Sequence, residues 1–375
     1  MGLHEDGRRT ISYSEISTFQ HCERQHELSY RQGLRRNSED IGASAIGVIV
    51  HLAIAEALRW YHANDYRQDE AHIFNVIANA TRQWADEHRP KSLPSLDGDD
   101  YMTDDSGLTQ QQRDFDVAVD EAAAIAYRTV MHLDVPNNWR TEEDANGVPM
   151  IEYRIEKPML WLPNEDVVTF VGYVDWVARD IHSNTIYIVD WKTRKTFQED
   201  ETNFLIGEDF NVQLSLYQYV LASQGIPVVG NIIYQISSRL PEIPELTKTG
   251  AVSRAKIKTD WETYSNFVLA MGLDVNDYLD VKANLDRVEF WRPVTHYRSS
   301  TEVANRWREA QEWADDIISH ETSGRYSKKV ETVMCRFCPF ASICLAEDKG
   351  YDVDFVIEQR YNKRIEQAQV EPETE

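Results

Sequence analysis

The stretch Thr185-Ile186-Tyr187-Ile188-Val189-Asp190-Trp191-Lys192 places an acid and a lysine at the end of an apolar strand. Side chains alternate across a strand, so Ile186, Ile188, Asp190 and Lys192 share one face. A strand this apolar is typical of the centre of a sheet, where charged groups are costly to bury without a task. An Asp-x-Lys tripeptide can also be a plain ion pair, so the surrounding sequence decides its meaning.

A second acid precedes this strand, in Gly172-Tyr173-Val174-Asp175. If the segment Asp180–Asn184 forms a hairpin turn centred at His182, Asp175 lies seven positions before the centre and Asp190 eight after it. The two carboxylates would then be neighbours, an arrangement that favours a hard divalent cation. A nearby lysine can orient water and stabilise charge that develops on a phosphate. The pattern predicts metal-assisted phosphodiester hydrolysis.

Two further motifs carry polar side chains that could belong to such a site. Gln213 and Tyr217 are four residues apart and share one helix face, where they could contact a phosphate or simply line a surface. His51 follows Gly47 by one helical turn, and this small neighbour leaves room for a ligand. Histidine binds Mn²⁺ and Zn²⁺ well but is also common as a structural residue.

The cysteines form a third pattern. Cys335, Cys338 and Cys344 have the spacing C-x2-C-x5-C, and the only other cysteine is Cys22. Four thiolates can complete a zinc site or a [4Fe–4S] cluster, and the alternative is a set of unrelated buried cysteines. A shared metal would join the two ends of the chain, and closing so long a loop would add to the stability of the fold.

Composition limits the classes of function. The 375 residues include 63 acids and 39 Lys or Arg, for a net charge of −24, which opposes attraction of the whole molecule to nucleic acid. No apolar run reaches 18 residues, so no membrane-spanning helix is expected. The polar N-terminus lacks an apolar signal core, which predicts a cytoplasmic location.

Hydrophobic periodicity predicts helices before and after a block of strands. A capping box at Ser12 and Glu15 starts a helix expected to continue through Cys22 towards Tyr30. Further helices are expected over residues 43–61, 71–84, up to 133, 211–224 and 301–321. Strands are expected over residues 151–155, 167–178, 185–192 and 228–236.

Taken together, these motifs resemble the RecB-type branch of the PD-(D/E)xK nuclease superfamily. More narrowly, the chain is similar to the iron–sulfur members of that branch, the CRISPR-associated exonucleases and AddB-type nuclease domains. The resemblance extends from Ile11 to about Glu347 and rests on six ordered pieces: the opening segment Ile11–Cys22, G-x3-H at Gly47–His51, G-x2-D at Gly172–Asp175, D-x-K-T at Asp190–Thr193, Q-x3-Y at Gln213–Tyr217, and the three terminal cysteines.

The resemblance implies an α/β fold with a restriction-endonuclease-like core, in which helices flank a central mixed sheet. The expected organisation is an N-terminal helical region (1–147), the nuclease core (148–300) with an insertion near 237–290, a C-terminal helix and cysteine motif (301–350), and an acidic tail (351–375). Neither the acidic stretch Asp97–Glu121 nor the segment Pro241–Leu285 has a counterpart in the family pattern.

The resemblance also implies the site and its cofactors. His51, Asp175 and Asp190 would hold Mg²⁺ or Mn²⁺, Lys192 would be the catalytic lysine, and Gln213 and Tyr217 would line the site. Cys22, Cys335, Cys338 and Cys344 would bind [4Fe–4S], with zinc as a substitute.

The function implied is a metal-dependent DNA exonuclease that acts on ends or single strands in recombination, repair or replication. The alternative is a non-catalytic accessory factor that keeps the nuclease fold and binds DNA or a protein. A basic protein partner would suit the acidic surface of either.

Overall fold

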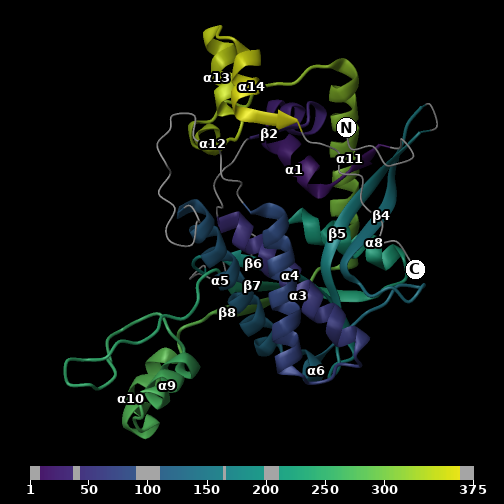
Figure 1. Ribbon diagram of the computed structural model, residues 1–375. Coiled ribbons are helices and arrows are strands. Elements are labelled where there is room, and N and C mark those ends of the chain that lie inside the picture. Colours follow the sequence, from purple (N-terminus) through teal and green to yellow (C-terminus); the bar gives the residue numbers. More distant parts are fainter. Residues whose placement is uncertain (1–8, 37–42, 90–109, 164–165, 198–210, 364–375) are drawn as a thin grey trace.

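The computed structural model describes residues 9–36, 43–89, 110–163, 166–197 and 211–363. A seven-stranded mixed sheet lies at its centre (Figure 1). Its main path is β1 (Thr10–Ile11), β5 (Val167–Asp180), β6 (Thr185–Arg194), β7 (Val228–Ser237) and β8 (Trp291–His296). The strands β3 (Trp139–Thr141) and β4 (Ile151–Trp161) also pair with β5. The expected mixed α/β fold with helices around a central sheet is therefore confirmed.

The hairpin between β5 and β6 sets the register of the sheet centre. Trp176 pairs with Val189 and Asp180 with Thr185, so the turn falls where Asp180–Asn184 predicted it. The Asp180 carboxylate accepts hydrogen bonds from the backbone N–H groups of His182 and Ser183, which closes the turn. The strand β7 then lies parallel to β6.

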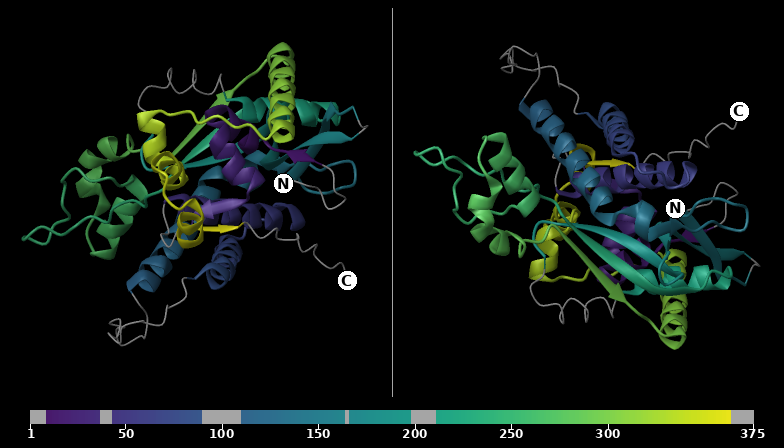
Figure 2. Two further views of the ribbon diagram at one scale, coloured as in Figure 1. Left: turned by 90° about the horizontal axis from the view of Figure 1, so that it is seen from above. Right: turned by 90° about the horizontal axis from the view of Figure 1, so that it is seen from below.

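Helices cover both faces of the sheet (Figures 1 and 2). The helices α3 (Ala43–Ala63), α4 (Glu70–His88) and α5 (Gln110–Leu133) pack on one face, against Trp176 and Trp191. On the other face lie α1 (Tyr13–His21), α8 (Val212–Ser223) and α11 (Ser300–Ser323), against Ile186 and Ile188. The side chains of β6 therefore alternate between the two faces as expected, and Ile186 and Ile188 pack on the face covered by α8.

The first helix differs from the expectation. It does not run from Ser12 to Tyr30 but ends at Cys22, whose backbone is extended with φ −163°. The chain restarts as α2 (Glu23–His26) and a π-helical turn η1 (Glu27–Arg31). Local periodicity continues across the break, so the pattern of apolar residues could not reveal it.

The two ends of the chain fold together. The strand β2 (Leu34–Arg36) pairs antiparallel with β9 (Tyr361–Lys363). The helices α12 (Thr332–Phe337), α13 (Ala341–Lys349) and α14 (Val353–Arg360) lie beside the N-terminal helices in each view (Figures 1 and 2). The expected start of the acidic tail, at residue 351, is therefore too early, because residues 353–363 form a helix and a strand. Residues 364–375 lie outside the described residues.

The segment Pro241–Leu285 forms a small projecting unit with α9 (Trp261–Ala270), the 3₁₀ turn η2 (Val275–Tyr278) and α10 (Leu279–Leu285) (Figure 1). It has its own apolar cluster around Tyr264 and Tyr278. The short helix α6 (Val135–Asn138) connects α5 to β3. Within the described residues, no helix is both long and apolar enough to cross a membrane.

Candidate active site

Three carboxylates lie side by side where β4, β5 and β6 meet. Trp176 pairs with Val189, which places the preceding Asp175 beside Asp190 on the next strand. Tyr153 pairs with Val174 and Ile151 with Trp176, which places Glu152 opposite Asp175. The backbone N–H of Trp191 donates a hydrogen bond of 2.9 Å to Asp175 Oδ2. Cross-strand neighbours lie about 5 Å apart, so the three acids form one row.

Glu152 is the site residue that sequence reasoning missed. The sequence predicts a strand over residues 151–155 and assigns Glu152 no role in a site. In the structure its φ is +48°, a conformation uncommon for residues other than glycine. Its side chain faces Asp175, and no feature of a single sequence signals a backbone of this kind.

His51 on α3 completes a cluster of possible metal ligands. One ligand atom from each of His51, Glu152 and Asp175 lies within 4.8 Å of the other two. His51 Nδ1 is 3.7 Å from Asp175 Oδ2. The close approach of α3 requires Gly47, because a Cβ there would lie 2.8 Å from Thr193 Oγ1. The G-x3-H and D-x-K-T motifs are therefore in direct contact.

The protonation of these groups reflects burial together with their neighbours. Burial and the charge of Lys192 lower the pKa of His51 to about 4, so its ring is neutral at pH 7 and one ring nitrogen has a lone pair that can bind a cation. Burial raises the pKa of Asp175 and of Asp190 above the ordinary range for aspartate. Burial and Asp175 raise the pKa of Glu152 to about 7. A bound divalent cation would remove this mutual repulsion.

The Glu152 carboxyl should therefore lower the stability of the metal-free protein as the pH rises. Folding lifts the pKa of Glu152 from 4.5 to about 7, so between these values the folded state holds a proton that the unfolded chain has lost. At pH 8, Glu152→Gln should raise the free energy of unfolding by about 3 kcal/mol in EDTA, and below pH 4.5 the gain should vanish. Denaturant unfolding across this pH range measures it.

The matched control is Glu156→Gln, which changes an exposed acid on the same strand. It should leave the pH dependence unchanged. Glu152→Gln should also weaken Mn²⁺ binding in calorimetric titration. A variant with wild-type pH dependence and wild-type Mn²⁺ affinity would remove Glu152 from the site.

Lys192 is held against Asp190. Its Nζ lies 2.8 Å from Asp190 Oδ2 and 3.0 Å from Oδ1. Asp190 is buried, with 4% of its surface exposed, whereas the Lys192 side chain is 34% exposed. The ammonium group can therefore reach a bound substrate while its charge is partly balanced by a fixed carboxylate.

The helix α8 carries the Gln213 and Tyr217 side chains, and Tyr217 lies near Asp175 and Asp190. Gln213 Nε2 donates a hydrogen bond of 3.0 Å to Tyr217 Oη. The Tyr217 ring packs against Gly172, where a Cβ would come within 2.5 Å of Tyr217 Cε1. The glycine of the G-x2-D motif is thus needed for the ring of the Q-x3-Y motif to fit over β5.

The contact between Gly172 and the Tyr217 ring leads to a prediction about the stability of the protein. Gly172→Ala should destabilise the protein by about 1 to 3 kcal/mol, the usual cost of overpacking a buried contact. In a Tyr217→Ala background the same change should cost much less, because the clashing ring is gone. Urea unfolding of the four proteins in this double-mutant cycle gives the coupling between the two sites. Equal costs in both backgrounds would show that the ring does not set the requirement for glycine.

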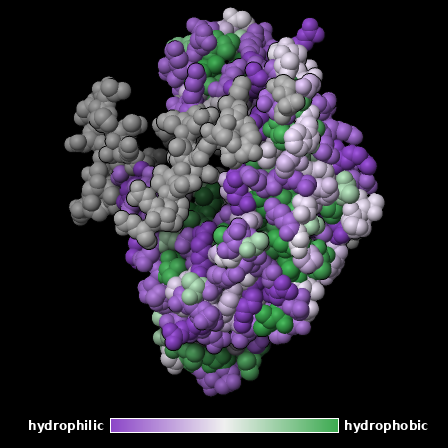
Figure 3. Space-filling view, turned by 90° about the vertical axis from the view of Figure 1, so that its right-hand side faces the viewer, coloured by the Kyte–Doolittle hydropathy of each residue, from purple (hydrophilic) through white to green (hydrophobic). Residues whose placement is uncertain are grey.

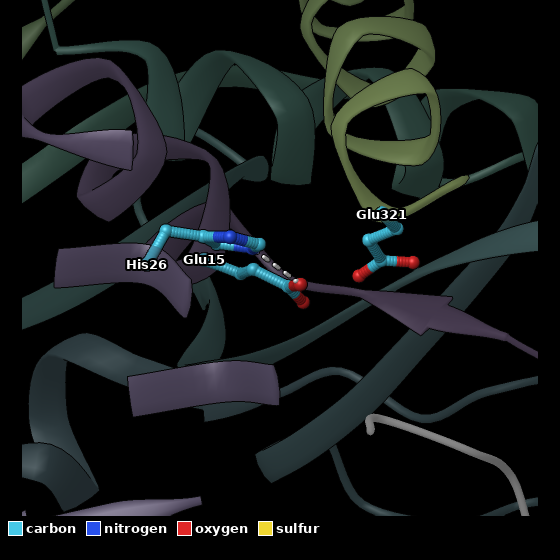
Figure 4. Close-up of side chains that lie close together, drawn as sticks. All are labelled: Glu15, His26 and Glu321. Atoms are coloured by element: carbon cyan, nitrogen blue, oxygen red, sulfur yellow. Dashed lines mark hydrogen bonds and ion pairs between the residues drawn. The ribbon is translucent and has the colours of Figure 1, made fainter. Parts of the chain in front are cut away.

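A second His and carboxylate cluster, Glu15, His26 and Glu321, lies between the N-terminal helices and the end of α11 (Figure 4). Its acids already have a cationic partner, because Arg9 forms ion pairs with Glu15 and with Glu321, the latter at 2.9 Å. His26 Nε2 lies 3.0 Å from Glu15 Oε1. Although burial alone would raise the pKa of Glu15, these partners hold it below its ordinary value. We therefore interpret these side chains and Arg9 as a network of ion pairs and not as a second metal site.

The four cysteines converge from both ends of the chain. Burial raises the pKa of the Cys344 thiol to about 11, and burial with the charges of Cys22 and Cys335 raises that of Cys338. Cys338 also packs against a shared apolar cluster that includes Leu28 and Phe340. No three of the four sulfur atoms lie within 4.8 Å of one another. The Cys335 thiol is directed at the Lys329 backbone oxygen, 3.7 Å away, and the Cys338 thiol at Gln25 Oε1, 3.8 Å away.

Of the arginines near Cys22, two are engaged and two are exposed. Arg24 forms ion pairs with Glu27 and Glu347, and Arg31 donates a hydrogen bond to the backbone oxygen of Glu321. Arg35 and Arg36 on β2 are both exposed. Arg35 and Arg36 are thus the two arginines of this segment with exposed side chains.

The structure thus brings together acids, a histidine and a lysine where strands of a mixed sheet meet, and His51, Glu152 and Asp175 among them could hold a metal ion. The sequence matches the PD-(D/E)XK nuclease superfamily over residues 10–345. The chain therefore belongs to this superfamily, whose members typically use divalent metals.

Comparisons with curated proteins and with solved structures do not extend this family assignment. No curated protein matches the sequence. A solved structure titled "Crystal structure of SSO0001" is similar at 12% identity, over 62% of this chain and 75% of that one, with a TM-score of 0.26. The family assignment rests on the sequence match and on the sheet that carries its motifs.

Proposed function

We propose that the chain is a metal-dependent deoxyribonuclease, and that it acts as an exonuclease on DNA ends or single strands. The observation that supports this most is the row Glu152, Asp175 and Asp190, with His51 on one side and Lys192 on the other. A non-catalytic binding factor has no need for clustered acids with raised pKa values, since they destabilise a metal-free fold at neutral pH.

His51, Glu152 and Asp175, together with Asp190, would hold Mg²⁺ or Mn²⁺. When bound, such an ion activates water and offsets charge on the phosphate. The protein's own groups have separate tasks. Lys192 donates to the attacking water or to a phosphate oxygen as charge develops there, and Asp190 fixes the position of its ammonium group. Tyr217, held by Gln213, orients the neighbouring phosphate.

We further infer that Cys22, Cys335, Cys338 and Cys344 hold a [4Fe–4S] cluster. All four cysteines are free, and the charges of Cys22 and Cys335 act on Cys338 although Cys22 comes from the far end of the chain. Four such thiolates can bind a cluster, and the resemblance of the C-x2-C-x5-C motif to the iron–sulfur nucleases favours it over zinc. Its place between the two termini gives it a structural role.

Matched linear and circular single-stranded DNA of one sequence test the activity and its mode together. With Mg²⁺ or Mn²⁺, the linear form should be degraded from an end and the circular form should persist, while EDTA should stop the reaction. Equal cleavage of the circle would make the protein an endonuclease. Cleavage in EDTA would exclude metal dependence, and no cleavage of either DNA with either ion would favour the accessory factor.

A further inference from the structure

A cavity of about 480 Å³ lies at the base of the projecting unit, away from the row of catalytic acids. Its walls come from the end of α3, the start of α4, the second half of α5, β8 and the first turn of α9, which Figure 1 labels. No motif of the nuclease family contributes a side chain to it. The cavity is therefore a second possible binding site.

The cavity combines aromatic rings with acids. Tyr61, Tyr127 and Trp291 line it, and the His132 ring stacks on Trp291 with centroids 4.3 Å apart. Its acidic side chains are Asp69, Glu70, Asp134 and Glu262. Aromatic faces and carboxylates are the groups that bind organic cations in proteins.

The charge in the cavity is unbalanced. Its one arginine, Arg128, already pairs with Asp260 and lies with its guanidinium carbon 5.6 Å from the centre of the Trp291 ring. Within the described part of the chain, neither Glu70 nor Glu262 forms an ion pair. Burial lowers the pKa of His132, so its ring adds no positive charge at neutral pH.

The Tyr61 side chain, which is buried and lines the cavity, gives an independent sign of a missing ligand. Tyr61 is only 3% exposed, lines the cavity, and makes no hydrogen bond through its hydroxyl group within the described residues. Buried polar groups normally have a partner. Burial and the charges of Glu70 and Asp134 raise the pKa of Tyr61 to about 12, so it stays protonated and can act as donor or acceptor.

The arrangement of the acidic side chains around the cavity does not suit a bare metal ion. No three ligand atoms of the acids and histidine around this cavity lie within 4.8 Å of one another, so they surround a space and do not converge on a point. An extended cation suits such a space. A guanidinium group is planar, stacks on aromatic faces and binds carboxylates with a fork of donors, which an ammonium group cannot do.

We propose that this cavity receives an arginine side chain presented by a partner polypeptide. The net charge of −24 would attract a basic partner from a distance, and the cavity would supply the specific contact. Arg128 already makes the same stacking contact from within the chain. The site is separate from the catalytic row, so the proposal does not depend on the proposed nuclease function.

The test uses ¹⁹F NMR on full-length protein that contains fluorotryptophan. The Trp291 signal is the one absent from Trp291→Phe. A short capped Gly/Ser peptide with one central arginine should shift this signal saturably. The same peptide with citrulline, the neutral analogue of arginine, should not. Equal shifts from both peptides would overturn the proposal, because charge would then play no part.

Variants locate the binding. The pair Glu70→Gln and Glu262→Gln should weaken peptide binding by about threefold to tenfold, since both carboxylates are exposed and an exposed ion pair contributes up to about 1 kcal/mol. The matched pair Asp86→Asn and Asp120→Asn removes the same charge from exposed positions and should bind as the wild type does. Tyr61→Phe should weaken binding several-fold. Wild-type affinity in the Glu70 and Glu262 pair would overturn the proposal, as would a shift with spermidine but none with the arginine peptide.

Discussion

Lys192→Ala is expected to lower the rate of phosphodiester cleavage by about 100-fold to 1000-fold, the usual cost of removing one group that stabilises developing charge. The Lys192 ammonium group is the cation that the structure places beside both Asp190 oxygens. DNA affinity should change little, because one phosphate contact among many is lost. Single-turnover cleavage of end-labelled DNA in Mg²⁺ measures the effect.

The same variant should also shift the pH dependence of its residual activity upward. The charge of Lys192 lowers the pKa of Asp190 against the opposing effect of burial, so its removal leaves a carboxyl that keeps its proton to higher pH. Metal binding needs the ionised form. Metal affinity should therefore be compared at pH 8.5 or above, where it should match the wild type.

Lys256→Ala is the matched control, since Lys256 is an exposed lysine in the projecting unit. It should keep full activity and the wild-type pH profile. A Lys192→Ala protein with full activity would show that cleavage occurs elsewhere. A variant with lower activity but an unchanged pH profile would separate Lys192 from the ionisation of Asp190.

Much of this site was predictable because its parts obey short-range rules. The pairing of Asp175 with Asp190 follows from a turn signal and from counting along two strands. The contact between Gln213 and Tyr217 follows from helical spacing. In each case a local pattern determines the geometry, so one sequence is enough to derive it.

Other parts depend on packing that no local pattern encodes. Glu152 faces Asp175 from a left-handed backbone conformation, which the strand pattern of residues 151–155 does not indicate. The break at Cys22 is not visible in the apolar pattern of the helix. The contacts of Gly47 with Thr193 and of Gly172 with Tyr217 join segments distant in sequence. Those glycines appear in the motifs, but their reason is found only in the folded structure.

The folding of residues 353–363 was also outside the reach of composition. The segment is rich in charge, which suggested a tail. Tyr361 nevertheless lies buried against Leu28, Leu34 and Phe340, and its hydroxyl group donates a hydrogen bond to the Pro339 backbone oxygen. The strand needs its partner β2 from the far end of the chain, and that partner cannot be inferred from the segment itself.

Cys22→Ala is expected to remove the brown colour of anaerobically purified protein and to loosen the C-terminal helices. Cys22 would be the only cluster ligand from the N-terminal end, and the loop that it closes is more than three hundred residues long. Links across long loops contribute about 2 to 4 kcal/mol. Absorption near 400 nm, iron and sulfide content, and the unfolding midpoint measure the loss.

The loss should be partial, because three protein contacts join the same parts without a cluster. The strands β2 and β9 remain paired, Arg24 keeps its ion pair with Glu347, and the Arg24 backbone N–H donates to Ser327. Limited proteolysis should therefore cut first between Gly324 and Glu331, where the chain has no helix or strand, and leave the nuclease core whole. Gln20→Ala, an exposed change on α1, should have no effect on colour or cleavage. If the wild-type protein is colourless and contains zinc, the four cysteines form a zinc site and not an iron–sulfur cluster. If Cys22→Ala protein keeps its full iron content, Cys22 is not a ligand.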